Sequence, residues 1–221
     1  MQESDIVILH EDDSVVVIDK PSGLITHPKY EDDDQYSVAE FMKTRSTDKT
    51  PLREGIVHRL DKDTSGMMIC AKSSEVKDFL QNQFKEHKVS KTYSAVVYGK
   101  PEHQKLNIDL PIDRNPKRPS LQKVSANGKE AFTSVEVIES NNHLSYLEVK
   151  PKSGRTHQIR VHLKYIGNPV VNDPFYASTW EEYGSGRLML HAKSLNITLP
   201  GENEPREFAS DEPAEFKELV K

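Results

Sequence analysis

The stretch GIVHRLDKDTSGMMICAKS, residues 55–73, places charged and polar residues between two apolar runs. The second run, MMICAK at 67–72, is short and is bounded by polar residues, so its length favours a buried strand over a helix. Asp61 follows Arg59 by two residues, and a Thr-Ser-Gly turn comes immediately after. The stretch therefore predicts a loop that carries a carboxylate and a guanidinium and leads into a buried strand.

Asp61 has two interpretations from the local sequence. An Asp before a polar turn most often accepts backbone N–H groups, as an Asx-turn or a cap. The alternative is a carboxylate that a neighbouring arginine keeps ionised, since a guanidinium at hydrogen-bonding distance favours the charged form. Such a carboxylate is a poor acid but a ready nucleophile or base. Local sequence alone favours the structural role.

The composition limits the class of protein. With 221 residues, 35% of them hydrophobic and 29% charged, the chain fits a soluble globular protein with one sizeable domain. No window approaches the roughly 18 continuous apolar residues of a transmembrane helix, and the acidic N-terminus lacks the basic region of a secretory signal. The only cysteine, Cys70, lies in an apolar run, which predicts a buried thiol in a reducing compartment. We therefore expect a cytoplasmic protein without a membrane partner.

Charge is distributed unevenly along the chain. The net charge is −5, which by itself speaks against a nucleic-acid partner. Residues 1–40 contain 2 Lys and Arg against 11 Asp and Glu, whereas residues 85–164 contain 15 against 8. A basic surface with acidic flanks is therefore compatible with the negative total. The alternative is that these charges are ordinary solvated surface, and segment charge alone does not decide between the two.

Short apolar segments separated by turn residues dominate the chain. Ile159, Leu163 and Ile166 recur at helical spacing before Gly167, which predicts a helix that ends at that glycine. Because the segments do not alternate as strand, helix and strand, we expect an α+β fold with a mainly antiparallel mixed sheet and flanking helices. The other predicted segments are two strands around an acidic turn within 6–23, short helices near 37–43 and at the C-terminus, strands at 67–72 and 91–99, a helix at about 74–87, an extended basic loop over 101–129, a hairpin over 131–151 and a strand pair over 187–200.

The segment KPKSGRTHQIRVHL, residues 150–163, contains further candidate site residues. Arg160 and Lys164 are four residues apart in the predicted helix and lie off its apolar stripe, so the helix can present cations beside a buried face. The alternative, which spacing favours, is a solvated amphipathic helix. No metal is expected, because no HxxxH or HExxH spacing occurs and no cysteine supports a site. The histidines weighed for that role are His58, His157, His162 and His191.

Tyr93 lies in the predicted strand SKTYSAVVYG. A strand tyrosine usually packs in the core or on the sheet surface. If the ring faced the same site as Asp61, it could stack on a nucleobase, an interaction of roughly 1–3 kcal/mol. None of these features is decisive alone.

Several motifs together resemble those of one enzyme family. HRLDKDTSG resembles the signature of the RluA-type pseudouridine synthases, which is HRLD, two variable residues and TSG. The likeness continues, in the order of the family, from about residue 15 to 199. The segments that carry it are DKPSGLITHP (19–28), SKTYSAVVYG (90–99), DLPIDRNPKRPSLQKV (109–124), SGRTHQIRVHLKYIGNPVVNDPFYAS (153–178) and RLMLHA (187–192).

The resemblance implies a role for individual residues. Asp61 matches the catalytic aspartate, and Arg160 matches the arginine that pairs with it. Tyr93 matches the tyrosine that packs on the target base, and Arg59 matches the arginine that occupies the space left by the flipped base. Leu190 lies in a segment that lines the pocket in related enzymes. One departure is Asn172, which stands where a glycine is common and concerns a loop conformation.

The implied reaction converts uridine to pseudouridine in RNA. It breaks the N1–C1′ glycosidic bond, turns the uracil and joins C5 to C1′, and it needs no metal, redox cofactor or nucleotide cofactor. The resemblance further implies a central cleft, a single catalytic domain over 1–221 without an S4 RNA-binding domain, and a monomer. The expected partner is a stem-loop of transfer RNA (the anticodon stem-loop), of 23S ribosomal RNA, or both. The residues expected to bind RNA, besides Arg59 and Leu190, are Arg114, Lys117, Arg118, Lys123 and Arg155.

Three alternatives remain beside this reading. A glycoside or nucleoside hydrolase would need paired carboxylates, and Asp63, a variable position of the signature, is the only acid beside Asp61 that the motif offers. A synthase specific for a different uridine has the same motifs. A non-catalytic RNA-binding homologue is disfavoured because Asp61, Tyr93 and Arg160 are all present.

Overall fold

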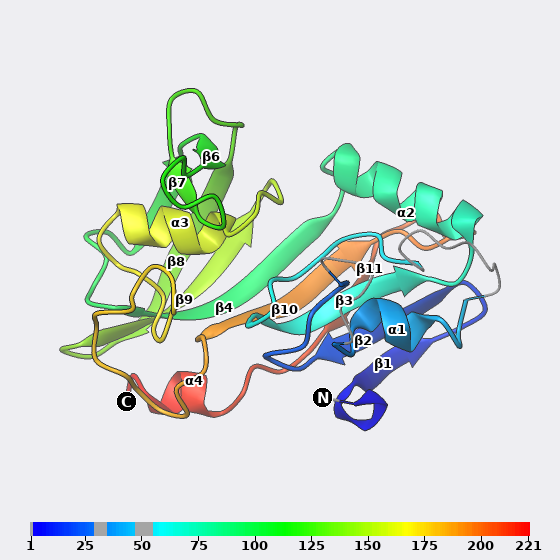
Figure 1. The fold of residues 1–221 in the computed structure, drawn as a ribbon, viewed down its shortest axis with the longest axis horizontal. Coiled ribbons are helices and arrows are strands. Elements are labelled where there is room, and N and C mark those ends of the chain that lie inside the picture. Colours follow the sequence, from blue (N-terminus) through cyan, green and yellow to red (C-terminus); the bar gives the residue numbers. More distant parts are fainter. Residues whose placement is uncertain (1, 29–34, 47–54) are drawn as a thin grey trace. The chain divides into compact units, whose positions relative to one another are not determined.

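The computed structural model describes residues 2–28, 35–46 and 55–221. Its elements are mostly antiparallel strands with a few helices (Figure 1), which confirms the expected α+β class. The chain forms two compact units. Unit 1 comprises residues 1–90 and 192–211, and unit 2 comprises residues 91–191 and 212–221. Among the described residues, no helix is long and apolar enough to cross a membrane.

Unit 1 is built on strands that follow each other in the sheet as β1, β2, β3, β10 and β11. The antiparallel pair β2–β3 runs in register from Val15 opposite Ala71 to Lys20 opposite Gly66. The bounds are β1 Val7–Glu11, β2 Val15–Lys20, β3 Ser65–Ala71, β10 Leu190–Ile197 (whose first two residues belong to unit 2) and β11 Arg206–Ala209, with helices η1 Glu3–Asp5, α1 Val38–Met42 and α2 Ser74–Lys85.

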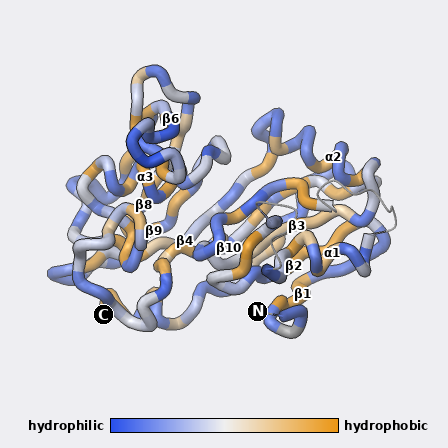
Figure 2. Tube along the Cα trace, in the orientation of Figure 1, coloured by the Kyte–Doolittle hydropathy of each residue, from blue (hydrophilic) through white to orange (hydrophobic). Residues whose placement is uncertain are grey.

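The core of unit 1 lies along β2 and β3. Every residue of β3 is buried, which confirms the strand predicted at 67–72 and extends it to Ser65. Cys70 is fully buried there, and burial raises the pKa of its thiol to about 12. Helix α2 begins after Ser73, whose hydroxyl accepts the N–H of Val76, and packs Leu80 into this core. Figure 1 shows α2 alongside β3, and Figure 2 shows the hydrophobic positions that these strands contribute.

Unit 2 is built on an antiparallel sheet in the order β4, β9, β8, β5. Val96, Leu147 and Val135 contribute to its core, against which α3 packs Leu163. The bounds are β4 Ser90–Tyr98, β5 Lys105–Asp109, β6 Ile112–Arg114, β7 Gln122–Val124, β8 Phe132–Ser140, β9 Leu144–Pro151, α3 Gln158–Tyr165 and α4 Glu215–Glu218.

Two predicted segments were wrong. The extended loop over 101–129 contains three short strands: β5 joins the sheet beside β8, and β6 and β7 form a two-stranded ladder of their own. The segment 187–200 holds one strand, β10, whose partner β11 comes later in the chain. The hairpin of β8 and β9 and the end of α3 are confirmed, the latter because Gly167 follows the helix with a φ of +87°.

Candidate active site

The loop that carries Asp61 is held in place by a buried lysine. Lys20 is fully buried, and its ammonium donates to the carbonyl oxygens of Pro21 (3.0 Å), Leu24 (2.8 Å) and Lys62 (3.0 Å). Burying a cation costs free energy unless its N–H donors form hydrogen bonds. The main chain is therefore most stable where all three carbonyl oxygens stay within hydrogen-bonding distance of the ammonium. Lys20 thereby fixes the residue that follows Asp61.

Two hydroxyl groups reinforce the same loop from the segment after β2. The hydroxyl of Thr26 donates to the carbonyl oxygen of Leu60 at 2.9 Å, and that of Ser22 donates to the carbonyl oxygen of Asp63 at 2.7 Å. The main chain is therefore tied down immediately before Asp61 and two residues after it. A half-buried Asp61 on such a loop has little backbone freedom.

The turn after Asp61 explains the Thr-Ser-Gly part of the motif. The N–H of Thr64 donates to the main-chain carbonyl of Asp61 at 3.2 Å, so main-chain atoms close the turn. Gly66 has a φ of +108°, and a Cβ at this position would lie 2.4 Å from the carbonyl oxygen of Ala192 on β10. Only glycine allows β10 to approach so closely, which couples the loop to the sheet.

Arg59 is exposed beside a cavity of about 310 Å³ in unit 1. Leu60 and Lys62, the residues on either side of Asp61, also line it. Both sequence neighbours of Asp61 thus line the cavity, which has two cationic side chains, Arg59 and Lys62. Its lining is Ile25, Thr26, His27, Gln35, Arg59, Leu60 and Lys62.

His58, the first residue of HRLD, has a structural contact that the sequence did not reveal. Its Nε2 accepts the N–H of Ile69 on β3 at 3.1 Å, and its ring stacks on Phe84 of α2 at 4.8 Å between centroids. The acceptor role requires the tautomer with the proton on Nδ1. His58 therefore links the start of the loop to β3 and α2.

Arg160 is buried on α3 and bound to a carboxylate that sequence reasoning missed. Its Nε and Nη2 donate to Oδ2 and Oδ1 of Asp173 at 2.7 and 2.8 Å. Asp173 Oδ1 also accepts the N–H groups of Phe175 (2.9 Å) and Tyr176 (3.1 Å). Arg160 is 1% exposed, so the solvated position that spacing favoured for this residue is wrong. Its predicted pairing with Asp61, which belongs to the other unit, stays a prediction.

The segment after α3, which contains Asp173, forms a turn beside Arg160. The preceding residue, Asn172, has a φ of +58°, a left-handed conformation that Asn tolerates better than most residues. The rings of Phe175 and Tyr176 lie 5.3 and 5.4 Å from the guanidinium carbon of Arg160. The Asp-Pro pair in VVNDPFY is a turn signal, and this is the clue from which Asp173 could have been singled out.

Tyr93 is half-buried on β4, opposite Val149 of β9. Lys91, two residues earlier and hence on the same strand face, was not singled out from the sequence. Its ammonium donates to the carbonyl oxygen of Ser153 at 3.0 Å, and burial lowers its pKa to about 8.

The four cations predicted to clamp RNA lie together on one structured hairpin. Arg114 pairs with Gln122 across β6 and β7, and the connecting turn is closed by the N–H of Asn115, which donates to Leu121 at 2.9 Å. The side chains at 114, 117, 118 and 123 are all exposed. Figure 2 shows this region as largely hydrophilic.

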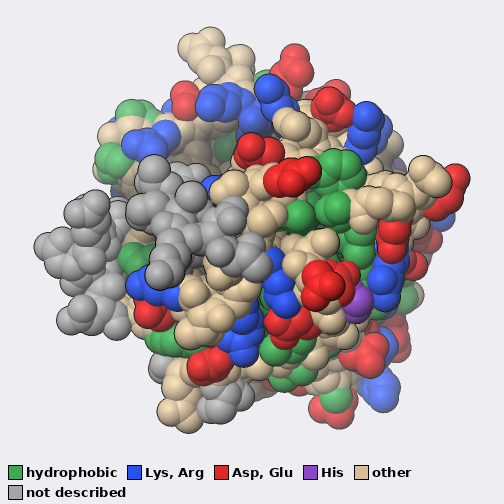
Figure 3. Space-filling view, turned by 90° about the vertical axis from the view of Figure 1, so that its right-hand side faces the viewer, with side chains coloured by type: hydrophobic (Ala, Val, Ile, Leu, Met, Phe, Trp, Pro, Cys, Tyr) green, Lys and Arg blue, Asp and Glu red, His purple; other side chains and the backbone are tan. Residues whose placement is uncertain are grey.

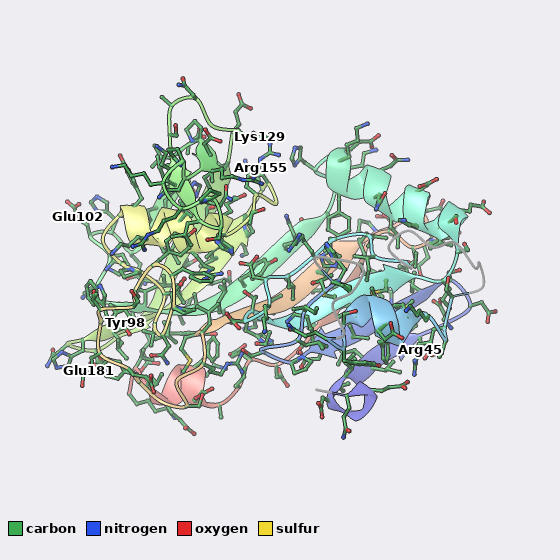
Figure 4. The ribbon with its side chains drawn as sticks, viewed as in Figure 1. Arg45, Tyr98, Glu102, Lys129, Arg155 and Glu181 are labelled. Carbon is green, nitrogen blue, oxygen red and sulfur yellow. The ribbon has the colours of Figure 1, made fainter. Side chains whose placement is uncertain are left out.

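Arg155 and Leu190 have contrasting surroundings. Arg155 is exposed, and its Nε donates to the carbonyl oxygen of Glu130 at 3.0 Å. Figure 4 shows the neighbouring Lys129 beside it, which adds a cation that the sequence analysis did not select. Leu190 is 3% exposed in the core of unit 2, and its role toward RNA stays a prediction.

Three of the histidines weighed as metal ligands, His58, His157 and His162, form hydrogen bonds within the protein. In unit 2, His162 contacts the hydroxyl of Thr133 (2.8 Å) and the carbonyl oxygen of Leu110 (2.9 Å), and burial lowers its pKa. His157 Nδ1 lies 3.0 Å from the hydroxyl of Tyr176. Among the described residues, no group of three His, Cys, Asp or Glu side chains is arranged to hold a metal ion.

Comparison with known proteins shows the family. The model of the RNA pseudouridylate synthase family matches residues 14–165. Dual-specificity RNA pseudouridine synthase RluA of Escherichia coli K12 is 37% identical over 217 residues, which cover 97% of this chain and 96% of that protein. Ribosomal large subunit pseudouridine synthase D of Borreliella burgdorferi is 37% identical over 218 residues, covering 96% of this chain and 66% of that protein.

A solved structure agrees with this result. Human RNA pseudouridylate synthase domain containing 1 superposes with a TM-score of 0.75 at 25% identity, covering 96% of this chain and 86% of the human chain. The chain therefore belongs to the RNA pseudouridine synthases, isomerases that convert uridine to pseudouridine in RNA. The RluA-type resemblance of its motifs is confirmed.

Proposed function

We propose that Asp61 is the carboxylate with which this pseudouridine synthase isomerises a uridine in a structured RNA. The observation that carries the proposal is the way Lys20, Thr26 and Ser22 anchor the main chain on both sides of Asp61. A reacting group must be held close to its productive geometry, and a loop anchored in this way meets that requirement. The reaction breaks N1–C1′ and forms C5–C1′, C5 loses its proton to water and N1 gains one from water, so no redox change occurs and one ionised carboxylate is the minimum that the protein must supply.

Other side chains take supporting roles in this proposal. Tyr93 packs on the target uracil, and Arg160 pairs with the carboxylate of Asp61 while Asp173 holds the guanidinium in place. Arg59 fills the space that the flipped nucleotide leaves. Extruding a base costs a few kcal/mol, and basic side chains that bind phosphates offset that cost. The exposed cations of the β6–β7 hairpin and Arg155 are suited to this task.

The proposed substrate is a stem-loop of transfer RNA, of ribosomal RNA, or of both. The names of two relatives, each 37% identical, point to different substrates: one acts on the large ribosomal subunit and the other has dual specificity. Identity alone does not choose between them. The proposal includes a single catalytic domain that works as a monomer in the cytoplasm, where these RNAs are found.

Tritium release tests the role of Asp61. Transcripts of the transfer and ribosomal RNAs, labelled at C5 of uridine, should release tritium with the native chain, and Asp61→Asn should abolish the release. Asp63→Asn is the matched control, since it makes the same change two residues away at a variable position of the motif, and it should retain activity. Undiminished release by Asp61→Asn, or an equal loss in Asp63→Asn, would contradict the assignment.

A further inference from the structure

A second concave site lies in unit 2, between α3 and the β6–β7 hairpin. Its volume is about 300 Å³, at the lower end of the range for ligand pockets, which is roughly 300–1,000 Å³. Such a volume suits one small ligand. The residues that line it are Asn115, Leu121, Gln122, Lys123, Val124, Val161, Lys164, Tyr165 and Tyr176. All of them belong to unit 2, whereas Asp61 belongs to unit 1.

The walls of this pocket are held by specific bonds. The hydroxyl of Tyr176 accepts the N–H of Gln122 at 2.9 Å and lies 3.3 Å from its carbonyl oxygen, which joins β7 to the segment after α3. Val124 pairs with Ile112 in the β6–β7 ladder and packs, with Tyr176, against the buried cluster of Ile112, Ala131 and Val161. The pocket thus has an apolar floor and a backbone frame that does not depend on a ligand.

The rim has the chemistry that recognises a nucleotide. Val161, Lys164 and Tyr165 are at i, i+3 and i+4 on α3 and therefore share one helix face. Tyr165 is 61% exposed, so its ring is available for stacking. Lys123 and Lys164 are exposed and line the same pocket. Among the described residues that line the pocket none is acidic, so its charge is complementary to a phosphate.

We propose that this pocket binds one unpaired nucleotide of the substrate RNA, outside the nucleotide that reacts. The base stacks on Tyr165 above the floor formed by Val124 and Val161, and the phosphates on either side meet Lys123 and Lys164. Lys123 also belongs to the hairpin proposed to clamp RNA, so the pocket is continuous with that surface. This inference deepens the proposed function and rests on it, because it assumes that the chain binds a structured RNA.

RNA affinity measures the contribution of Tyr165. Binding of the labelled stem-loop is followed by fluorescence anisotropy in the Asp61→Asn background, in which the RNA is not consumed. Tyr165→Ala should weaken binding by about 5- to 150-fold, the range for loss of one base–aromatic stack, whereas Tyr165→Phe should bind normally. Ile138→Ala is the matched control, because Ile138 is a 52% exposed hydrophobic residue of the same unit outside the pocket.

A titration locates the nucleotide directly. Uridine 5′-monophosphate added at millimolar concentration to the full chain, with labelled valine methyl groups, should shift the NMR signals of Val124 and Val161. The signals of Val170, which is fully buried in the core of the same unit, should stay in place. An equal shift with inorganic phosphate alone, or no shift at all, would overturn the proposal.

The two experiments separate this inference from the proposed function. If Tyr165→Ala binds RNA as tightly as Ile138→Ala while the native chain releases tritium, the pocket serves another ligand, such as a protein, and only the inference fails. If the native chain releases no tritium, the proposed function fails whatever the affinity. A large drop in the melting temperature of Tyr165→Ala would assign the residue to the fold and equally overturn the nucleotide subsite.

Discussion

Lys20 and Arg160 are the largest fully buried cations among the described residues. Different kinds of hydrogen-bond partner offset the free-energy cost of removing each of them from water. Lys20 donates to three main-chain carbonyls, which suits a compact ammonium with several donors. Arg160 binds both oxygens of Asp173, which suits a planar guanidinium. The first arrangement fixes backbone, and the second fixes the direction of a side chain. At the scale of the residue, burial of charge therefore sets the geometry of the candidate site.

Asp173→Asn tests how much the buried pair of Arg160 and Asp173 contributes to stability. The amide keeps the shape of the carboxylate but removes the negative charge that faces Nε and Nη2 of the buried Arg160 guanidinium. Removal of one member of a buried pair costs about 3–5 kcal/mol, so the free energy of unfolding in urea should fall by that amount. Glu136→Gln, which breaks the exposed pair with Lys105, should cost at most about 1 kcal/mol. Equal losses in the two variants would show that the buried pair contributes nothing special.

At the scale of the element, close approach of strands decides what the motif residues must be. Gly66 lies where β3 meets β10, and Gly201 lies in a turn of the same unit and also has a positive φ, +83° against +108° at Gly66. A Cβ at 66 would lie 2.4 Å from a main-chain oxygen, whereas a Cβ at 201 would meet nothing within 4 Å. Alanine at 201 therefore adds only the free-energy cost of a positive φ, whereas alanine at 66 adds the cost of a steric overlap as well.

Alanine at each of the two positions measures both costs. Gly201→Ala should lower the free energy of unfolding by about 1–2 kcal/mol, the strain of a left-handed conformation. Gly66→Ala should lower it by a further 1–3 kcal/mol or so, because β10 must move to relieve the overlap. Urea unfolding of both variants gives the difference. If Gly66→Ala proves no less stable than Gly201→Ala, the approach of β10 is looser than the distance implies.

The elements that the sequence predicted are those with a clear period or an end signal. The helix at 74–87 and the end of α3 at Gly167 agree with the structure because apolar spacing and a C-terminal glycine are local features. Strands β6 and β7 have three residues each, too few for a period to appear. Asp173 was missed because its partner, Arg160, is thirteen residues away on another element. Local pattern predicted the elements that have a period or an end signal, and contacts distant in sequence were beyond it.

At the scale of the whole molecule, the two units differ in charge. Unit 1 contains 14 Lys and Arg against 22 Asp and Glu, whereas unit 2 contains 16 against 13. The chain is therefore negative as a whole although the unit with the proposed clamp is positive. Figure 3, which shows the molecule from the side of α2 and β1, has acidic and basic side chains intermixed on the surface that is not grey.

The salt dependence of RNA binding tests whether the β6–β7 hairpin supplies that surface. The logarithm of the binding constant falls linearly with the logarithm of the salt concentration, with a slope set by the number of phosphates neutralised. The double variant Arg118→Gln and Lys123→Gln should weaken binding and reduce the slope by about 2, one unit for each lost phosphate contact.

The matched control is Lys105→Gln with Lys150→Gln, two exposed lysines of unit 2 that already pair with Glu136 and Glu148. That control should leave the slope unchanged, because these ammonium groups neutralise carboxylates. An unchanged slope in the hairpin variant would remove the hairpin from the RNA interface, and an equal reduction in both variants would mean that the charge of unit 2 acts as a diffuse field.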